Sequence, residues 1–307
     1  MEFIKAKLKE LFYLLKDEFI PEQKKRLKIF LYCPRLFIWI GIVMFTGHLF
    51  LFGGYYSWLL GDSLLIPNIF ITFILLLFSL SNIIEWIVRK LEDVRHVATD
   101  KEKEYLQPIY NHVYNAYKNQ CSNLSHKVRL YIVDTMKVES FAIGRKTIAI
   151  SRGMIETMSD EELKGVIAHE FSHIVLYHSQ IRLIIATATN IQLWCFIAVE
   201  KILMRIISTM KSDNIIAILL KLVHLIFATI VNIIMFIANM IIIPNYRNSE
   251  FKADNLTVKC GFGLELKNAL YKIYDMEISD KKELLKRIYD MHPRTAYRIE
   301  KIENTLN

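Results

Sequence analysis

Long uncharged apolar stretches dominate the pattern of hydrophobic and polar positions along the chain. A helix needs about twenty apolar residues to cross the hydrocarbon core of a bilayer. Four windows approach or exceed that length: Leu36–Gly61, Ser63–Ile84, Leu183–Val199 and Leu222–Tyr246. We therefore predict four transmembrane helices, arranged as two hairpins.

The polar stretches between these windows carry shorter patterns. The runs VRLYIVD at 128–134 and KTIAIS at 146–151 are rich in β-branched and aromatic residues and alternate in polarity, which is typical of short strands. Gly144 marks a turn before the second run. Ser159 and Glu162 form a Ser-x-x-Glu capping box, which predicts that a helix begins there.

The two hydrophobic hairpins divide the chain into five segments. Residues 1–35 form a basic amphipathic segment, residues 36–88 the first transmembrane hairpin and residues 181–244 the second. The polar segments 89–180 and 245–307 must then meet as two parts of one domain, with the second hairpin inserted between them. The expected fold is mostly α-helical with a small β-sheet, in a multi-pass membrane protein.

The first 35 residues contain an apolar stripe rather than a signal peptide, because they hold no early apolar core followed by small residues. Apolar side chains recur at roughly helical spacing between lysines, which is typical of a helix on a membrane surface. A helix packed on the polar domain would show the same stripe. The stripe consists of Phe3, Leu8, Leu11, Phe12, Leu15 and Phe19.

Composition and charge support a membrane protein. Hydrophobic residues make up 53% of the chain, which is too many for an ordinary soluble protein. The net charge of +8 comes from basic residues beside the predicted spans, where anionic lipid attracts them, so no nucleic-acid partner is needed to explain it.

The distribution of lysine and arginine predicts the orientation in the membrane. Residues 1–35 hold nine basic residues, and Arg89, Lys90 and Arg95 follow the second window, whereas the loop between the first two windows has none. The positive-inside rule then places the N-terminus and both polar segments in the cytoplasm, and residues 53–67 outside. One group of basic residues near the loop between the last two windows opposes this: Lys201, Arg205, Lys211 and Lys221.

The stretch GVIAHEFSHIVLYHS contains a candidate metal-binding motif, His-Glu-x-x-His, formed by His169, Glu170 and His173. Histidines four residues apart lie on one face of a helix, where both imidazoles can reach one ion. Glu170 then lies beside the metal, where it can accept a proton from the attacking water and return one to the leaving amine. The pattern predicts a zinc-dependent hydrolase.

A catalytic zinc needs a third protein ligand. Leu176 and Ser179 occupy the positions where a metzincin has glycine and histidine, so that class is excluded. His178 is expected to point away, because it lies nine residues beyond His169 and about half a turn out of phase. The downstream sequence NSEFKADNLTVK supplies Glu250 as a ligand, and Asp254 one turn later can hydrogen-bond the far ring nitrogen of a ligand histidine.

Four separated motifs carry a resemblance to a known family. They are SFAIGRKTIAISRGMIETMSDEELKGVIAHEFSHIVLYHS, two hydrophobic windows, RNSEFKADNLTVKCG and HPRTAYRIEKI. In this order they resemble the HtpX-like membrane zinc metalloproteases, relatives of the CAAX prenyl proteases. The resemblance implies a zincin-like (gluzincin) catalytic domain with one zinc ion per chain. It also implies His169, His173 and Glu250 as zinc ligands, Glu170 as catalytic base and Asp254 as the carboxylate behind a ligand.

The resemblance also assigns a role to His292, which precedes Pro293 and would hydrogen-bond the tetrahedral oxyanion. A His-Pro pair by itself more often only begins a helix. The family usually has Asn-Ala before Phe141, whereas this chain has Glu139 and Ser140. An ionised Glu139 cannot donate a hydrogen bond to an oxyanion, so more of that role would fall to His292.

Residues from Phe141 to Ser151 are expected to include an edge strand that binds substrate. Phe141, Ala142, Ile143 and Gly144 are its predicted contact residues. An extended peptide can pair with such an edge through main-chain hydrogen bonds. The alternative is a purely structural strand that other elements cover.

The leading hypothesis is an integral membrane zinc metalloendopeptidase that acts in protein quality control and cleaves extended segments of membrane proteins, especially misfolded ones. The expected location is the cell (inner) membrane of a prokaryote, with the catalytic domain facing the cytoplasm. One alternative is a CAAX-type protease acting on prenylated peptides, which would be expected to have more spans. A second alternative is a membrane scaffold or transporter in which the His-Glu-x-x-His motif arose by chance.

Overall fold

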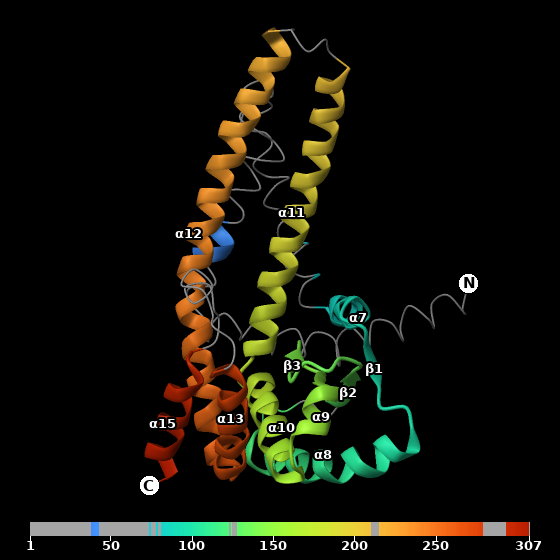
Figure 1. Cartoon of the computed structure of the whole chain (residues 1–307), viewed down its shortest axis with the longest axis vertical. Coiled ribbons are helices and arrows are strands. Elements are labelled where there is room, and N and C mark those ends of the chain that lie inside the picture. Colours follow the sequence, from blue (N-terminus) through green and yellow to red (C-terminus); the bar gives the residue numbers. More distant parts are fainter. Residues whose placement is uncertain are drawn as a thin grey trace, which may run out of the picture.

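Two long helices rise from a compact base that contains the other elements (Figure 1). They are α11 (His178–Ser208) and α12 (Ile215–Lys259). The computed structural model describes residues 38–42, 74, 78, 81–122, 124, 128–209, 215–278 and 293–306.

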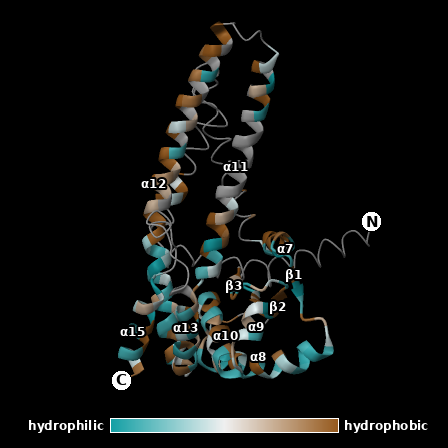
Figure 2. Cartoon of the chain, in the orientation of Figure 1, coloured by the Kyte–Doolittle hydropathy of each residue, from teal (hydrophilic) through white to brown (hydrophobic). Residues whose placement is uncertain are grey.

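Helix α12 has the length and the apolar composition of a transmembrane helix. Within the part of the chain that the structure describes, one helix is long and apolar enough to cross a bilayer, over Ala228–Lys259. Only 19% of its most apolar window is buried, whereas the core helix of a soluble protein would be mostly covered. Hydrophobic residues predominate where α12 rises above the base, and hydrophilic residues where it enters the base (Figure 2).

The count of four spans remains a prediction. The first two windows lie largely outside the described residues, and the third, Leu183–Val199, lies within α11. The second window overlaps a separate helix, α7 (Asn82–Leu91), whose N-cap Ser81 accepts a hydrogen bond from the Ile84 amide. Ile84, the last residue of the window, packs with Tyr131 and Ala149 of the sheet, so the window ends within the base.

The base contains a four-stranded mixed sheet with strand order β1-β2-β4-β3. Strand β1 (Val94–His96) pairs antiparallel with β2 (Arg129–Val133), which pairs parallel with β4 (Thr147–Ser151). Strand β3 (Ser140–Ile143) pairs antiparallel with β4 and forms the other edge. The two predicted β-rich runs are β2 and β4.

Helix α10 (Asp160–Val175) is the centre of the base. It begins at the predicted capping box, in which Glu162 Oε2 accepts the Ser159 amide at 2.7 Å. Its side chains from Val166 to Val175 are buried between the sheet and the surrounding helices. Those neighbours include α8 (Asp100–Gln120), α12 and α13 (Gly263–Ile278).

The close approach of α10 to α13 joins the two polar segments of the chain. At Gly165 any Cβ atom would overlap the Leu266 backbone, so glycine is required for this packing. Helix α15 (Thr295–Leu306) covers the outer side of α12 and α13. Residues 160–175, 263–278 and 295–306 thus contribute to one packed unit, although the α11–α12 hairpin separates the first of these segments from the other two in sequence.

The turn between β3 and β4 is held from two sides. Gly144 begins it with φ +58°, a conformation that favours glycine. The buried Glu85 carboxylate of α7 accepts the Lys146 amide at 3.1 Å and the Thr147 hydroxyl at 2.8 Å. Ser179 Oγ of α11 donates to the Gly144 carbonyl at 2.6 Å. The helices next to the membrane segments therefore position the edge strand.

Candidate metal centre

Helix α10 presents His169 and His173 on the same face. Their positions differ by one helical turn, and their Nε2 atoms lie 3.0 Å apart. Both imidazoles are buried within the base. The local sequence therefore produces the expected histidine pair as soon as α10 forms.

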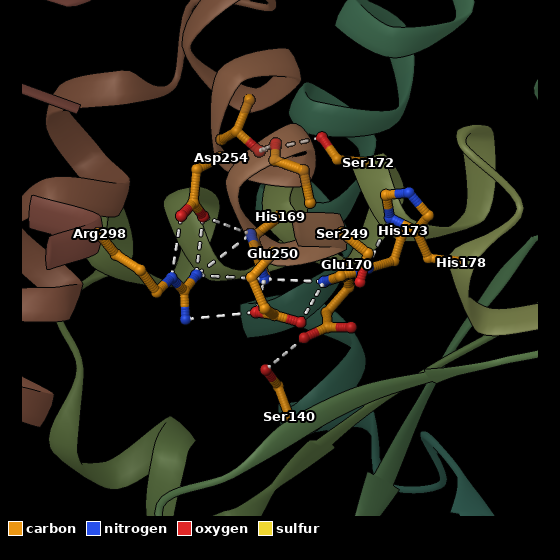
Figure 3. A network of polar contacts seen from close by, with 12 residues as sticks. Ser140, His169, Glu170, Ser172, His173, His178, Ser249, Glu250, Asp254 and Arg298 are labelled. Atoms are coloured by element: carbon orange, nitrogen blue, oxygen red, sulfur yellow. Dashed lines mark hydrogen bonds and ion pairs between the residues drawn. The ribbon is translucent and has the colours of Figure 1, made fainter. Parts of the chain in front are cut away.

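Glu250 of α12 completes a three-residue cluster (Figure 3). Its Oε2 lies 3.4 Å from His169 Nε2, and its Oε1 lies 3.3 Å from His173 Nε2. The three potential ligand atoms all lie within 4.8 Å of one another, and all three residues are buried. Two imidazoles and one carboxylate in this arrangement could hold a metal ion.

The donor chemistry of this cluster fits zinc. Asp254 Oδ1 lies 3.0 Å from His169 Nδ1, so the carboxylate favours the tautomer with hydrogen on Nδ1. The Nε2 lone pair of His169 is then directed at His173 and Glu250. Two histidines and one glutamate are a known ligand set of catalytic zinc sites, and that set leaves a coordination position for water.

The charges around the cluster shift the pKa values of the two histidines in opposite directions. Burial, with the nearby charge of Arg182, lowers the pKa of His173 well below its ordinary value. Burial and the charge of Arg298 also lower the pKa of His169, but hydrogen bonds to Asp254 and Glu250 outweigh them and raise it to about 9. The two carboxylates thus stabilise positive charge at His169, which a divalent ion at the cluster would also supply.

Glu170 lies beside the cluster and outside the set of ligand atoms. Its carboxylate is buried and its Oε1 accepts a hydrogen bond from Ser140 Oγ of β3 at 2.8 Å. Its Oε2 has no hydrogen-bond partner among the residues that the structure describes. That oxygen is available to accept a proton, which is the role predicted for Glu170.

Arg298 of α15 lies in the site, although its sequence position did not indicate a role there. Its guanidinium donates to both Asp254 oxygens, at 2.9 Å and 2.7 Å, and Nη1 lies 3.4 Å from Glu250 Oε2. Burial lowers the pKa of Arg298, but the charge of Asp254, its hydrogen bonds and the charge of Glu250 together outweigh burial and raise the pKa. Arg298 lies in the HPRTAYRIEKI motif. Its partner Asp254 could not be inferred from the sequence, because the two residues are 44 positions apart and belong to different helices.

Arg182 of α11 also contacts Glu250, through Nη2 and Oε1. Its guanidinium lies 6.0 Å from the centre of the Tyr246 ring. Two arginines from different helices therefore flank the carboxylate that completes the cluster. Arg182 directly precedes the predicted window Leu183–Val199, and no motif in the sequence pointed to it.

The expectation that His178 points away is wrong. His178 Nδ1 lies 3.2 Å from His173 Nδ1, on the side of that ring opposite the cluster. The prediction assumed one continuous helix, but α10 ends at Val175 and Tyr177 adopts φ +62° before α11 begins. This break changes the helical phase and turns His178 back toward His173.

The predicted substrate strand is shorter in the structure. Of the two strands within residues 141–151, β3 lies at a sheet edge, whereas β4 is buried between β2 and β3. Phe141, Ala142 and Ile143 belong to β3, whereas Gly144 is a turn residue. His292 lies outside the described residues, and Glu139 is exposed.

Comparison with known proteins identifies the family signal. Residues 100–306 match the family model described as "Peptidase family M48". A protease HtpX homologue of Methanocaldococcus jannaschii is 28% identical over 203 residues, which cover 57% of this chain and 68% of the relative. One from Bacteroides fragilis is 34% identical over 91 residues, which span only 28% of each chain.

The arrangement of the elements is also similar to that of a solved structure. The crystal structure of Ste24p from S. mikatae has a TM-score of 0.50 at 15% sequence identity, and the similarity covers 92% of this chain and 65% of that one. At this identity the likeness concerns the fold alone. The family match extends over more than half of the chain and includes every residue of the metal cluster, so the chain belongs to peptidase family M48 and is an HtpX-like member of it.

Proposed function

We propose that this chain is an integral membrane zinc metalloendopeptidase that cleaves extended segments of membrane proteins, especially misfolded ones. The observation that carries the proposal is the buried cluster of His169, His173 and Glu250, with Glu170 beside it, at the base of a long apolar helix. Membership of peptidase family M48 supports the peptidase activity.

The chemistry divides between the ion and the protein. Zinc held by His169, His173 and Glu250 would polarise the scissile carbonyl and make water more acidic. Glu170 accepts a proton from the attacking water through Oε2 and delivers one to the amine that leaves. Water is thereby added across the peptide bond, which yields one carboxylate product and one amine product. Asp254 and Arg298 keep the His169 ring in its orientation.

The edge strand β3 supports an extended substrate. It is the last strand in the sheet order, and its sequence neighbour β4 occupies its other side. A peptide that pairs with this edge would bind through main-chain groups, so affinity would depend little on side-chain identity. Such binding suits a protease that acts on many unfolded segments in quality control.

Chelation should separate a zinc-dependent peptidase from a scaffold or transporter. Purified protein in detergent is expected to contain about one zinc ion per chain and to cleave an unfolded membrane-protein substrate. A strong chelator should abolish cleavage, because no protein group replaces the ion, and added zinc should restore it. The measurements are metal analysis and the rate of product formation.

A prenylated peptide and its unprenylated counterpart provide the matched substrate pair. Cleavage only of the prenylated peptide would favour the CAAX-type alternative, which uses the same residues. A chain without zinc that cleaves none of the substrates would support the scaffold or transporter reading.

We also propose that the base faces the cytoplasm in the cell (inner) membrane of a prokaryote. The basic residues around the first hairpin support this orientation. An Asp160→Cys variant, at the exposed start of α10, should react with a membrane-impermeant thiol reagent only after the membrane is opened. Labelling of intact cells at residue 160, compared with the same chain lacking that cysteine, would invert the orientation.

A further inference from the structure

Ser140 occupies a position that the proposed mechanism has not yet used. Its hydroxyl donates to Glu170 Oε1 at 2.8 Å, although β3 and α10 are separate elements (Figure 3). It is one of the two residues at which this chain departs from the pattern that the resembling family shows. The hydrogen bond connects the sheet edge directly to the Glu170 carboxylate, which is proposed as the general base in catalysis.

The register of β3 shows where the main-chain groups of Ser140 point. The Ser151 amide donates to the Glu139 carbonyl at 3.0 Å, and residues 140–143 continue the same antiparallel register. Hydrogen-bonded pairs alternate along an antiparallel ladder, so Phe141 and Ile143 bond to β4. The main-chain groups of Ser140 and Ala142 therefore point away from β4, toward the outer edge of the sheet.

The side chains of β3 alternate in the complementary way. Phe141 and Ile143 pack in a cluster with Ile84 of α7 and Leu183 of α11. Ala142 packs instead against the core that contains α10, and Ser140 reaches Glu170 on that same side. The main-chain groups of Ser140 thus point to the sheet edge, and its side chain points to Glu170, the proposed general base.

This hydrogen bond restricts the Glu170 carboxylate. With Oε1 held by Ser140, Oε2 is the oxygen without a partner among the described residues. A buried carboxylate held by one directional hydrogen bond has fewer orientations available, which favours the geometry needed for proton transfer. Through this hydrogen bond, any movement of β3 on substrate binding would also move the Glu170 carboxylate.

We propose that Ser140 is a positioning residue, whose hydroxyl holds Glu170 in its proton-accepting orientation and ties that orientation to the strand on which substrate binds. This inference rests on the proposed peptidase function. It concerns how the catalytic step is organised, and it adds no metal ligand and no further proton carrier.

Kinetics of the full-length protein test the role. Ser140→Ala should lower kcat about 10- to 100-fold, the scale expected when a reacting group is misplaced, and leave KM within about twofold. Ser140→Thr keeps a hydroxyl and should recover most of kcat. Zinc content should stay at the wild-type value in both variants, since Ser140 contacts no ligand atom of the cluster.

A matched control tests movement of the strand. Ser179→Ala removes a hydroxyl that also holds the β3–β4 hairpin, through the Gly144 carbonyl at 2.6 Å, and that lies 3.4 Å from the His173 carbonyl; among the described residues it has no hydrogen bond to Glu170. Its kcat should not fall as that of Ser140→Ala does. An equal fall in both variants would show that the loss comes from strand displacement and would overturn the proposal, as would a wild-type kcat in Ser140→Ala.

A double-mutant cycle tests whether Ser140 acts through Glu170. In a Glu170→Ala background, Ser140→Ala should cause no further loss of rate, whereas independent effects would multiply and contradict the proposal. The thermal unfolding midpoints of the same four proteins provide a readout without turnover. If the wild-type chain hydrolyses nothing, the proposed function fails, and strictly additive midpoints would then overturn the Ser140–Glu170 coupling separately.

Discussion

Replacement of Glu170 by glutamine is expected to reduce peptide hydrolysis by about 100- to 10,000-fold, the usual contribution of general acid–base catalysis. The amide is nearly the same size as the carboxylate and still accepts the Ser140 hydrogen bond, but it cannot take a proton from water. Zinc content and thermal stability should therefore match the wild type. The measurements are single-turnover cleavage, metal analysis and thermal unfolding of the purified protein.

Glu161→Gln is the matched control for this variant. Glu161 lies on the same helix, and its carboxylate pairs with Lys164 on the exposed surface. The control makes the same chemical change away from the site and should retain wild-type cleavage. Near-normal hydrolysis by Glu170→Gln would remove Glu170 from the mechanism.

Replacement of Glu250 should abolish stoichiometric zinc binding and cleavage together. Glu250 supplies the carboxylate of the cluster and contacts both His169 and His173, whereas Asp254, the other α12 carboxylate at the site, contacts His169 alone among the described residues. Glu250→Ala also leaves Arg182 and Arg298 without that carboxylate, which is unfavourable in a buried site. Glu250→Gln keeps the volume and separates loss of metal from loss of fold. Metal analysis and thermal unfolding measure the two effects.

Asp254→Ala should give a smaller loss at the same helix. Asp254 contacts the far nitrogen of His169, and removing such a partner typically costs about 10- to 100-fold in metal affinity or activity. Zinc retention under increasing chelator should therefore rank wild type, then Asp254→Ala, then Glu250→Ala. Asn255→Ala, on the exposed side of α12, is the control and should behave as wild type.

Retention of zinc by the Glu250 variants would contradict the assigned ligand set. Full zinc retention by both Glu250→Ala and Glu250→Gln would show that α12 does not supply the third ligand. His178, whose ring lies next to His173, would then be the first residue to substitute in search of that ligand.

The sequence by itself determined the parts of the site that lie within one helix. His169, Glu170 and His173 are placed by the 3.6-residue period of α10, and Asp254 follows Glu250 by one turn of α12. The start of α10 was equally local, because the capping box uses only Ser159 and Glu162. Local hydrogen bonds and helical periodicity suffice for such features, and both are legible in a short window of residues.

Longer-range relations could be proposed from sequence only through the pairing of chemical types. Glu250 was the expected partner of the histidine pair because zinc needs a third ligand, and the packing of α10 against α12 brings them together. The two β-rich runs were recognised and an edge strand was expected within residues 141–151, but the parallel pairing of β2 with β4 was not predicted. Strand order depends on contacts between distant segments, which the alternation within one strand does not encode.

Only the tertiary structure decided which further side chains meet at the site. Arg182, Ser140 and Arg298 come from α11, β3 and α15, and no spacing rule relates them to the histidines. His178 shows the same limit at short range, because one residue with positive φ at Tyr177 ends the helical phase. Periodicity predicts a side chain's direction only while the backbone remains regular. Where elements break or pack across long separations, burial and charge pairing in the folded chain determine the contacts.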